Sequence, residues 1–237
     1  MTEIQLILMY SLLSGSTVFI GGVLSHYFGH YVKNGLLKDE VIHSSTAFGG
    51  GILMAAVALV LIPEGMKVFS IFPMVFFFLA GAAVFLLLDR YISNKGGTMA
   101  QLLSMLLDFV PESIAMGAVF TKNIKLGTLL AIIIGIQNLP EAFNSYLDLK
   151  TKYSSGKCLA ILFLLSFSGV GSAFLGYYFL SDMPGAVGAL MLFSSGGIVY
   201  LIFQDIAPMS SLKKNWIPAL GACLGFLVGM VGVKFLA

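Results

Sequence analysis

The chain has 237 residues, of which 58% are hydrophobic and only 10% are charged. This composition, with a mean hydropathy of +0.97, excludes an ordinary water-soluble globular protein and indicates a protein embedded in a lipid bilayer. The formal net charge of +2 is too small for a nucleic-acid-binding surface, so we expect no nucleic-acid partner.

Apolar runs, each about 20 residues long, follow one another along the whole chain. Runs of this length cross a bilayer as helices, because an open sheet would leave backbone groups unpaired in hydrocarbon. The first run lacks a preceding basic region, so we interpret it as a retained span and not as a cleaved signal peptide. We therefore predict an all-α, polytopic fold and a single transmembrane transporter domain over residues 1–237. The eight predicted spans are Ile4–Phe28, Ser44–Ile62, Phe69–Leu88, Met99–Phe120, Leu126–Tyr146, Cys158–Leu180, Ala186–Ile206 and Trp216–Phe235.

Basic residues are distributed unequally between the two sides of these spans. The loops after the first, third, fifth and seventh spans hold nine Lys and Arg residues, whereas the opposite side holds four. By the positive-inside rule, the side with nine faces the cytoplasm. Both termini are therefore predicted to lie on the outer side of the cytoplasmic membrane. The nine residues are Lys33, Lys38, Arg90, Lys95, Lys150, Lys152, Lys157, Lys213 and Lys214.

A short internal repeat links the second and seventh spans. Phe48-Gly49-Gly50-Gly51 precedes Pro63 by the same interval at which Phe193-Ser194-Ser195-Gly196 precedes Pro208. With eight spans, the first three and the last three would then have opposite topology around a central pair. Inverted repeats of this kind are typical of secondary transporters, whose substrate sites lie near the bilayer midplane.

The fourth span carries two carboxylates next to a proline. Asp108 and Glu112 are four residues apart, so on a helix they face the same way, one turn apart. Pro111 removes a backbone N–H and clashes with the preceding turn. We predict that the helix kinks there and releases a carbonyl beside the carboxylates.

The fifth span repeats this arrangement with amides as well as a carboxylate. Gln137 and Glu141 are four residues apart, and Asn138 lies three residues before Glu141. Pro140 is predicted to kink this helix as Pro111 kinks the fourth. Two kinked helices with oxygen ligands at midspan would form a cation site inside the membrane.

The predicted midspan carboxylates have no basic partner, because no Lys or Arg lies in the central part of any span. An ionised carboxylate at the midplane costs at least ~2.5–3.5 kcal/mol. A bound cation would neutralise this charge. The alternative interpretation is that the acids are protonated and join the helices through hydrogen bonds.

Other polar residues are placed by the predicted orientation. Glu64 falls at the outer end of span two, and Asp205, beside Gln204, falls near the cytoplasmic end of span seven. They outline a pathway across the membrane, or else they are interfacial charges that face water. Asp89 and Asp148 are interpreted as ordinary charges at span ends.

Oxygen ligands from Asp, Glu, Gln and Asn suit Mn²⁺, Fe²⁺ or Mg²⁺ somewhat better than Zn²⁺, which usually takes His or Cys. The three histidines, His26, His30 and His43, fall near the cytoplasmic ends of the first two spans. We interpret them as interfacial residues, with reception of the metal at the exit as the alternative.

At these residues the chain resembles the ZIP (zinc/iron permease) family of divalent-metal transporters. The family's fifth span carries His/Gln-Asn/Asp/Glu-x-Pro-Glu/His-Gly, which Gln137–Glu141 matches closely, with Ala142 in place of the glycine. Its fourth span carries His-Asn-x-Pro-Glu-Gly. Here the Pro-Glu pair is kept, whereas Asp108 and Phe109 replace the His and the Asn.

The resemblance extends to span two, from Phe48 to Gly65, and to span seven, from Phe203 to Pro208. It implies eight spans in a 3+2+3 inverted-repeat arrangement, both termini outside, and transport of Zn²⁺, Fe²⁺ or Mn²⁺ toward the cytoplasm. The transported metal and the lipid bilayer would be the partners, with no prosthetic group and no enzymatic activity, and a homodimer stays open. The family's ligand positions fall on Asp108, Glu112, Gln137, Asn138 and Glu141.

Two rival functions stay open. An intramembrane aspartyl protease could use Asp108 and Asp205, although the chain has no Gly-x-Gly-Asp motif and Glu112 and Glu141 would be unexplained. A metal-sensing or structural membrane protein of the same fold would share the site but would not accumulate metal.

Overall fold

The computed structural model describes residues 2–32, 35–95, 100–213 and 215–236. Lys33 and Lys214, which contribute to the predicted orientation, lie outside the described residues. Within the described part of the chain every long element is a helix, and the β pairing there is one isolated bridge between Leu212 and Asn215. The all-α prediction is therefore confirmed.

The prediction of eight membrane spans is also confirmed, because eight helical segments of the described chain are long and apolar enough to cross a bilayer. Most extend a few residues beyond the predicted runs. Their elements are α1 (Glu3–Tyr31); α2 (Leu36–Ala56), η1 (Val57–Leu61) and α3 (Ile62–Met66); α4 (Ile71–Lys95); α5 (Ala100–Val119); α6 (Ile124–Lys150); α7 (Ser155–Leu165) and α8 (Ser168–Leu180); α9 (Pro184–Leu201), η2 (Ile202–Ile206) and α10 (Ala207–Ser210); and α11 (Ile217–Leu236).

The prolines of the central pair do not interrupt their helices. Helix α5 continues through Pro111, and α6 continues through Pro140. Each proline still lacks an N–H, but a helix packed against neighbouring helices in a membrane tolerates this loss. Both helices are therefore continuous at these positions, and the kink and the released carbonyl stay predictions.

Interruptions occur instead in spans two, six and seven. Two of them are single π-helical turns, η1 and η2, and each ends two residues before a proline. In η1 the N–H of Ile62 bonds to the carbonyl of Val57, and in η2 the N–H of Ala207 bonds to the carbonyl of Ile202. The wider turn makes room for the ring of the proline that follows. In span six, α7 and α8 are separated at Ser166 and Phe167.

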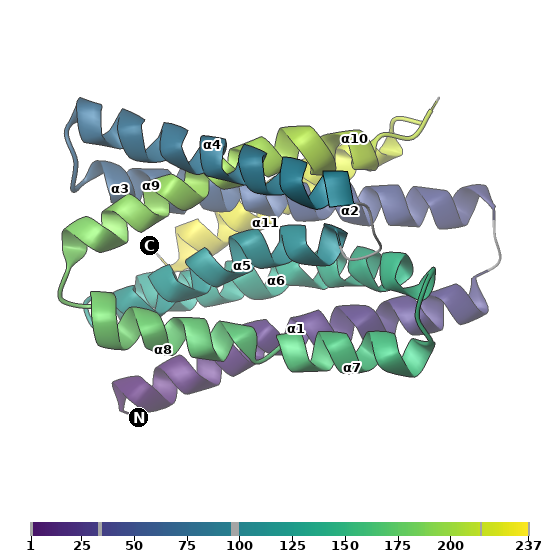
Figure 1. The fold of residues 1–237 in the computed structure, drawn as a ribbon, viewed down its shortest axis with the longest axis horizontal. Coiled ribbons are helices and arrows are strands. Elements are labelled where there is room, and N and C mark those ends of the chain that lie inside the picture. The colour runs from purple at the N-terminus through teal and green to yellow at the C-terminus, as the bar shows by residue number, and fades with distance from the viewer. Residues whose placement is uncertain (1, 33–34, 96–99, 214, 237) are drawn as a thin grey trace.

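The eight spans form two sets of helices, shown in Figure 1. In the first set, which we call bundle A, α1 packs along α6, and α5 packs along α8 and against α6. In the second set, bundle B, α2 packs along α11 and α4 packs along α9. Bundle A comprises α1, α5, α6, α7 and α8; bundle B comprises α2, η1, α3, α4, α9, η2, α10 and α11. The two bundles meet where α2 contacts α6 and where α5 contacts α9.

Glycines set the close approach of the helix pairs in bundle B. A Cβ atom at Gly51 in α2 would lie 2.0 Å from the Ala222 carbonyl oxygen of α11. A Cβ atom at Gly196 in α9 would lie 1.9 Å from the Phe78 carbonyl oxygen of α4. Both distances are far inside van der Waals contact, so only glycine fits at either position.

The partner helices make the reciprocal contact. A Cβ at Gly225 in α11 would lie 2.0 Å from the Phe48 carbonyl oxygen, and one at Gly81 in α4 would lie 1.8 Å from the Phe193 carbonyl oxygen. Phe48 and Phe193 are the first residues of the two repeated segments. The two helix pairs of bundle B therefore pack through equivalent positions.

The ends of the helices define two ends of the molecule. Both termini and α3 lie at one end, and α10 lies at the other, together with the start of α2 and the end of α6 (Figure 1). The candidate site lies toward this second end.

Candidate functional site

A cavity of about 220 Å³ lies between the two bundles. Residues of α5 and α6 form one wall, and residues of α2, α4, α9, η2 and α10 form the other. Five of the described residues that line it are carboxylic acids, and none of the lining residues is Lys, Arg, His or Cys. The five acids are Asp89, Asp108, Glu141, Asp148 and Asp205.

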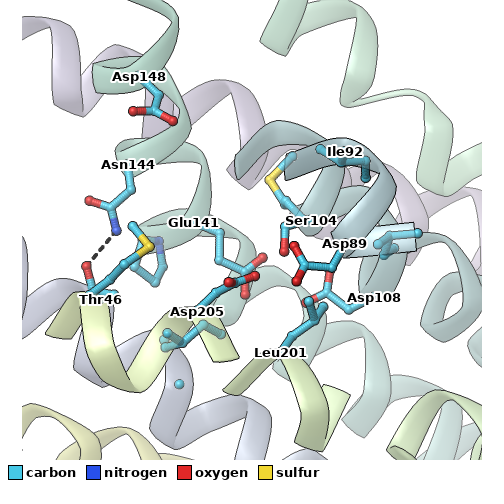
Figure 2. A pocket seen from close by; sticks show the side chains of 17 residues that line it. Thr46, Asp89, Ile92, Ser104, Asp108, Glu141, Asn144, Asp148, Leu201 and Asp205 are labelled. Atoms are coloured by element: carbon cyan, nitrogen blue, oxygen red, sulfur yellow. Dashed lines mark hydrogen bonds between the residues drawn. The ribbon is translucent and has the colours of Figure 1, made fainter. Parts of the chain in front are cut away.

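Helix α5 contributes Ser104 and Asp108, which are one turn apart. Asp108 is almost completely buried, at 3% exposure. One of its oxygens, Oδ1, accepts a hydrogen bond from the backbone N–H of Phe109, at 2.8 Å. This bond orients the carboxylate at the cavity wall, and Figure 2 shows the Asp108 side chain facing the cavity.

Helix α6 contributes Glu141, Asn144 and Asp148, whose spacings of three and four residues place them along one face. Both carboxylate oxygens of Glu141 are buried and have no hydrogen-bond partner. Figure 2 shows Glu141 directed toward Asp205 and Asp108. A buried acceptor normally has a partner, so Glu141 is an unsatisfied group at the centre of the cavity.

A hydrogen bond between side chains crosses from one bundle to the other at the cavity wall. The Asn144 amide of α6 donates to the Thr46 hydroxyl of α2, at 2.9 Å, and both side chains are 6% exposed. Figure 2 draws this bond. The amide oxygen of Asn144 is buried without a partner.

Bundle B contributes the two remaining acids, Asp89 from α4 and Asp205 from η2. The Tyr200 hydroxyl of α9 donates to Asp89 Oδ2, at 2.8 Å. Asp89 and Asp148, which we interpreted as ordinary charges at span ends, both line the cavity. Their position next to basic or loop residues gave no signal of this, since only the packing of α4 and α6 around the cavity turns them inward.

The predicted ligands that do not line the cavity are buried beside it. The Gln137 side-chain amide donates to Glu112 Oε2, and both residues are at most 1% exposed. Asn138 is fully buried, and neither its amide nitrogen nor its amide oxygen has a partner. Asp108 and Glu112 lie one turn apart on α5, as Gln137 and Glu141 do on α6.

The three predicted pathway residues are separated. Asp205 lines the cavity, whereas Gln204 is exposed and is not one of the lining residues. Glu64 lies in α3 at the end that carries the termini (Figure 1), where it pairs with Lys67 at 2.5 Å. The structure therefore brings one of the three to the cavity.

The carboxylates surround a cavity and do not form a closed coordination shell. Among the described residues, no group of three His, Cys, Asp or Glu side chains is placed to hold a metal ion as it stands. A cation in the cavity would therefore be held by one or two carboxylates at a time, with amide, hydroxyl or water oxygens completing its shell.

Comparisons with known proteins do not identify a relative. No protein-family model and no curated protein matches the chain. The resemblance to the ZIP family therefore rests on the motifs themselves.

Proposed function

We propose that the protein carries a divalent transition-metal cation across the membrane toward the cytoplasm, with Zn²⁺, Fe²⁺ and Mn²⁺ as the candidate ions. The observation that carries the proposal is the cavity that five acids line, with no basic side chain among its described lining residues, within spans long enough to cross a bilayer. Ionisable residues in such a position are costly and usually mark an ion pathway.

Unsatisfied oxygens support the predicted ligand set. Four of its five members have a buried side-chain oxygen that lacks a hydrogen-bond partner. Burying several hydrogen-bond acceptors without partners is unfavourable unless a ligand binds to them. We propose that the ion enters at Asp108 and Glu141, and that water molecules and oxygens of the inner group of acceptors complete its shell. The four members are Glu112, Gln137, Asn138 and Glu141.

The position of the cavity supports the proposed direction. Its lining residues Ile92, Asp148 and Met209 lie near the ends of α4, α6 and α10, at the end of the molecule away from both termini. If the positive-inside rule holds for this chain, that end faces the cytoplasm. The structure would then represent a state of the carrier that is open to the inside.

Equivalent positions in spans two and seven support the 3+2+3 inverted repeat. The π turns η1 and η2 have the same register relative to Pro63 and Pro208. The two glycine contacts of bundle B are also equivalent, as described above. In an inverted repeat, shifting one bundle against the other exposes a central site to each side in turn. A neutral hydrogen bond such as the one from Asn144 to Thr46 is weak enough to break during such a shift.

Reconstitution of the purified protein into liposomes tests the proposal. We expect saturable, protein-dependent accumulation of Zn²⁺, Fe²⁺ or Mn²⁺ inside the vesicles. Metal binding without accumulation would favour a metal-sensing or structural protein of the same fold. Absence of both would contradict the proposal.

A protease remains a second candidate, because Asp108 and Asp205 line the same cavity. A catalytic pair of aspartates would leave the unsatisfied oxygens of Glu112 and Glu141 without a role. Cleavage of a membrane-embedded peptide by the purified protein, lost in both Asp108→Asn and Asp205→Asn, would favour the protease over the carrier.

A further inference from the structure

We infer that the cargo is a hard, oxygen-preferring divalent cation, with Mn²⁺ as its transition-metal representative, and not Zn²⁺. This inference rests on the proposed transport function and narrows its substrate class. It follows from the donors that line the cavity, from where the nitrogen and sulfur donors lie, and from the spacing of the carboxylates.

The charged and amide donors at the cavity are oxygen atoms. They come from five carboxylates and from the amide of Asn144, with the hydroxyls of Ser104 and Thr46 nearby in the wall. Carboxylate, carbonyl and water oxygens suit Mg²⁺ and Mn²⁺, whereas zinc sites in proteins are built mainly from Cys and His.

The nitrogen and thiol donors of the described chain are engaged or placed elsewhere. The His26 ring hydrogen-bonds the Tyr146 hydroxyl at 2.8 Å, and the His43 ring hydrogen-bonds the Met209 backbone oxygen at 2.6 Å. Cys158 is buried in α7, and Cys223 is exposed on α11. The third histidine, His30, is exposed in the last turn of α1. None of these five side chains is among the residues that line the cavity.

Two thioethers are the exception to the oxygen lining. Met105 and Met209 contribute to the cavity wall, and a thioether is a ligand for soft metals. Met105 is 2% exposed and belongs to the hydrophobic core. Packing alone therefore explains a methionine at this position, with no need for a metal-binding role. The variant Met105→Leu, which keeps the volume and removes the sulfur, separates the two roles.

The spacing of the carboxylates also favours a hydrated ion. No three acidic, imidazole or thiol side chains of the described residues converge, and the cavity has room for several water molecules beside an ion. Mg²⁺ is bound in this way, through one or two carboxylates and several retained waters. Zn²⁺ instead takes about four direct ligands in a tetrahedron. Because the site offers no such tetrahedron, we expect Zn²⁺ to lose the higher affinity that it usually has over Mn²⁺.

Competition in proteoliposomes tests the inference. We expect Mn²⁺ uptake that a tenfold excess of Mg²⁺ lowers by more than half and that equimolar Zn²⁺ lowers by less than half. Loss of more than half of the uptake with equimolar Zn²⁺ would overturn the inference and leave the transport proposal intact. If no divalent ion accumulates, the transport proposal itself fails.

Two substitutions sharpen this test. Asp108→His adds an imidazole to the cavity, and we expect the Zn²⁺ concentration that halves Mn²⁺ uptake to fall about tenfold, since imidazole suits zinc. The matched control is Asp182→His, whose side chain is 87% exposed and pairs with Lys122, and which should change nothing. Met105→Leu should also leave the competition unchanged; if it weakens the effect of Zn²⁺ tenfold, sulfur is a ligand and the inference is overturned.

A binding measurement covers the case in which Asp108→His does not transport. Mn²⁺ bound to the detergent-solubilised protein loses its free-ion electron paramagnetic resonance signal, so displacement can be followed without uptake. We expect Zn²⁺ to displace Mn²⁺ at about tenfold lower concentration from Asp108→His than from the unmodified protein. Equal displacement from both would overturn the placement of the ion beside Asp108.

Discussion

Spans two and seven differ from spans four and five in how they accommodate a proline, which lies near the end of the first two spans and inside the other two. Before Pro63 and Pro208 the helix widens into a π turn, whereas α5 and α6 stay helical through Pro111 and Pro140. The first pair belongs to bundle B, which packs backbone against backbone through glycine. The second pair belongs to bundle A and carries the five predicted ligands. The same residue therefore marks an irregular turn in one pair and accompanies a regular ligand-bearing helix in the other.

This contrast assigns different roles to the two pairs. A regular helix holds side chains at fixed spacing, and this keeps Asp108 and Ser104, or Glu141 and Asn144, on one face. A π turn changes the direction of the residues that follow it, and η2 carries Asp205 to the cavity. We therefore expect ligand substitutions in bundle A to affect binding most, and packing substitutions in bundle B to affect stability most.

The largest expected effect is the loss of saturable uptake in Glu141→Ala. The substitution removes the two unsatisfied carboxylate oxygens at the centre of the cavity and leaves α6 a good helix. Initial rates of metal uptake in proteoliposomes measure it, and gel filtration in detergent checks folding. Glu64→Ala is the matched control, because Glu64 also follows a proline but lies at the opposite end of the molecule, paired with Lys67. Normal uptake in Glu141→Ala, or an equal loss of uptake in both variants, would contradict the assignment of metal binding to bundle A.

The next effect is on stability and concerns bundle B. Gly196→Val would place a side chain within 1.9 Å of the Phe78 carbonyl oxygen, which a rigid helix backbone cannot avoid. We expect a loss of roughly 1–3 kcal/mol or more, seen as a lower midpoint of thermal unfolding in detergent. Gly171→Val in α8 is the control, since a Cβ there meets no atom within 4 Å. If both variants unfold at the same temperature, close packing of α9 on α4 is not what stabilises bundle B.

The pH dependence of uptake distinguishes the carboxylate cavity from a purely structural acid cluster. A carboxylate binds a cation only when it is ionised, so protons compete with the metal and uptake should fall as the pH on the side of metal entry is lowered. Raising the metal concentration should restore the rate at low pH, because the competition is for the same oxygens. Uptake that fails to recover at saturating metal would show that acid unfolds the protein or blocks a later step.

The apolar pattern determined the spans well, because hydrocarbon accepts only helices of a set length. That Asp108 and Glu141 belong to a polar site could also be predicted, because an acid within a long apolar run is costly and usually functional. The position of Asp89 and Asp148 in the cavity wall could not be predicted. An acid at a span end normally faces water, and only the tertiary packing turns these two toward the cavity. The conformation at each proline was also beyond the sequence pattern. Pro63 and Pro140 are both followed by Glu, but one follows a π turn and the other lies within a continuous helix.

The smallest expected effect tests how bundle B presents its acids to the cavity. Tyr200→Phe removes the hydroxyl that donates to Asp89 Oδ2 at 2.8 Å and keeps the aromatic ring. A hydrogen bond to a charged group contributes about 1.5–3 kcal/mol, but Asp89 is one of five acids, so we expect the apparent affinity for metal to weaken by only about two- to fivefold. The maximal uptake rate should stay unchanged, because the ligands in bundle A remain intact. A Tyr200→Phe variant that lost transport as completely as Glu141→Ala would instead place the principal binding position at Asp89, in bundle B.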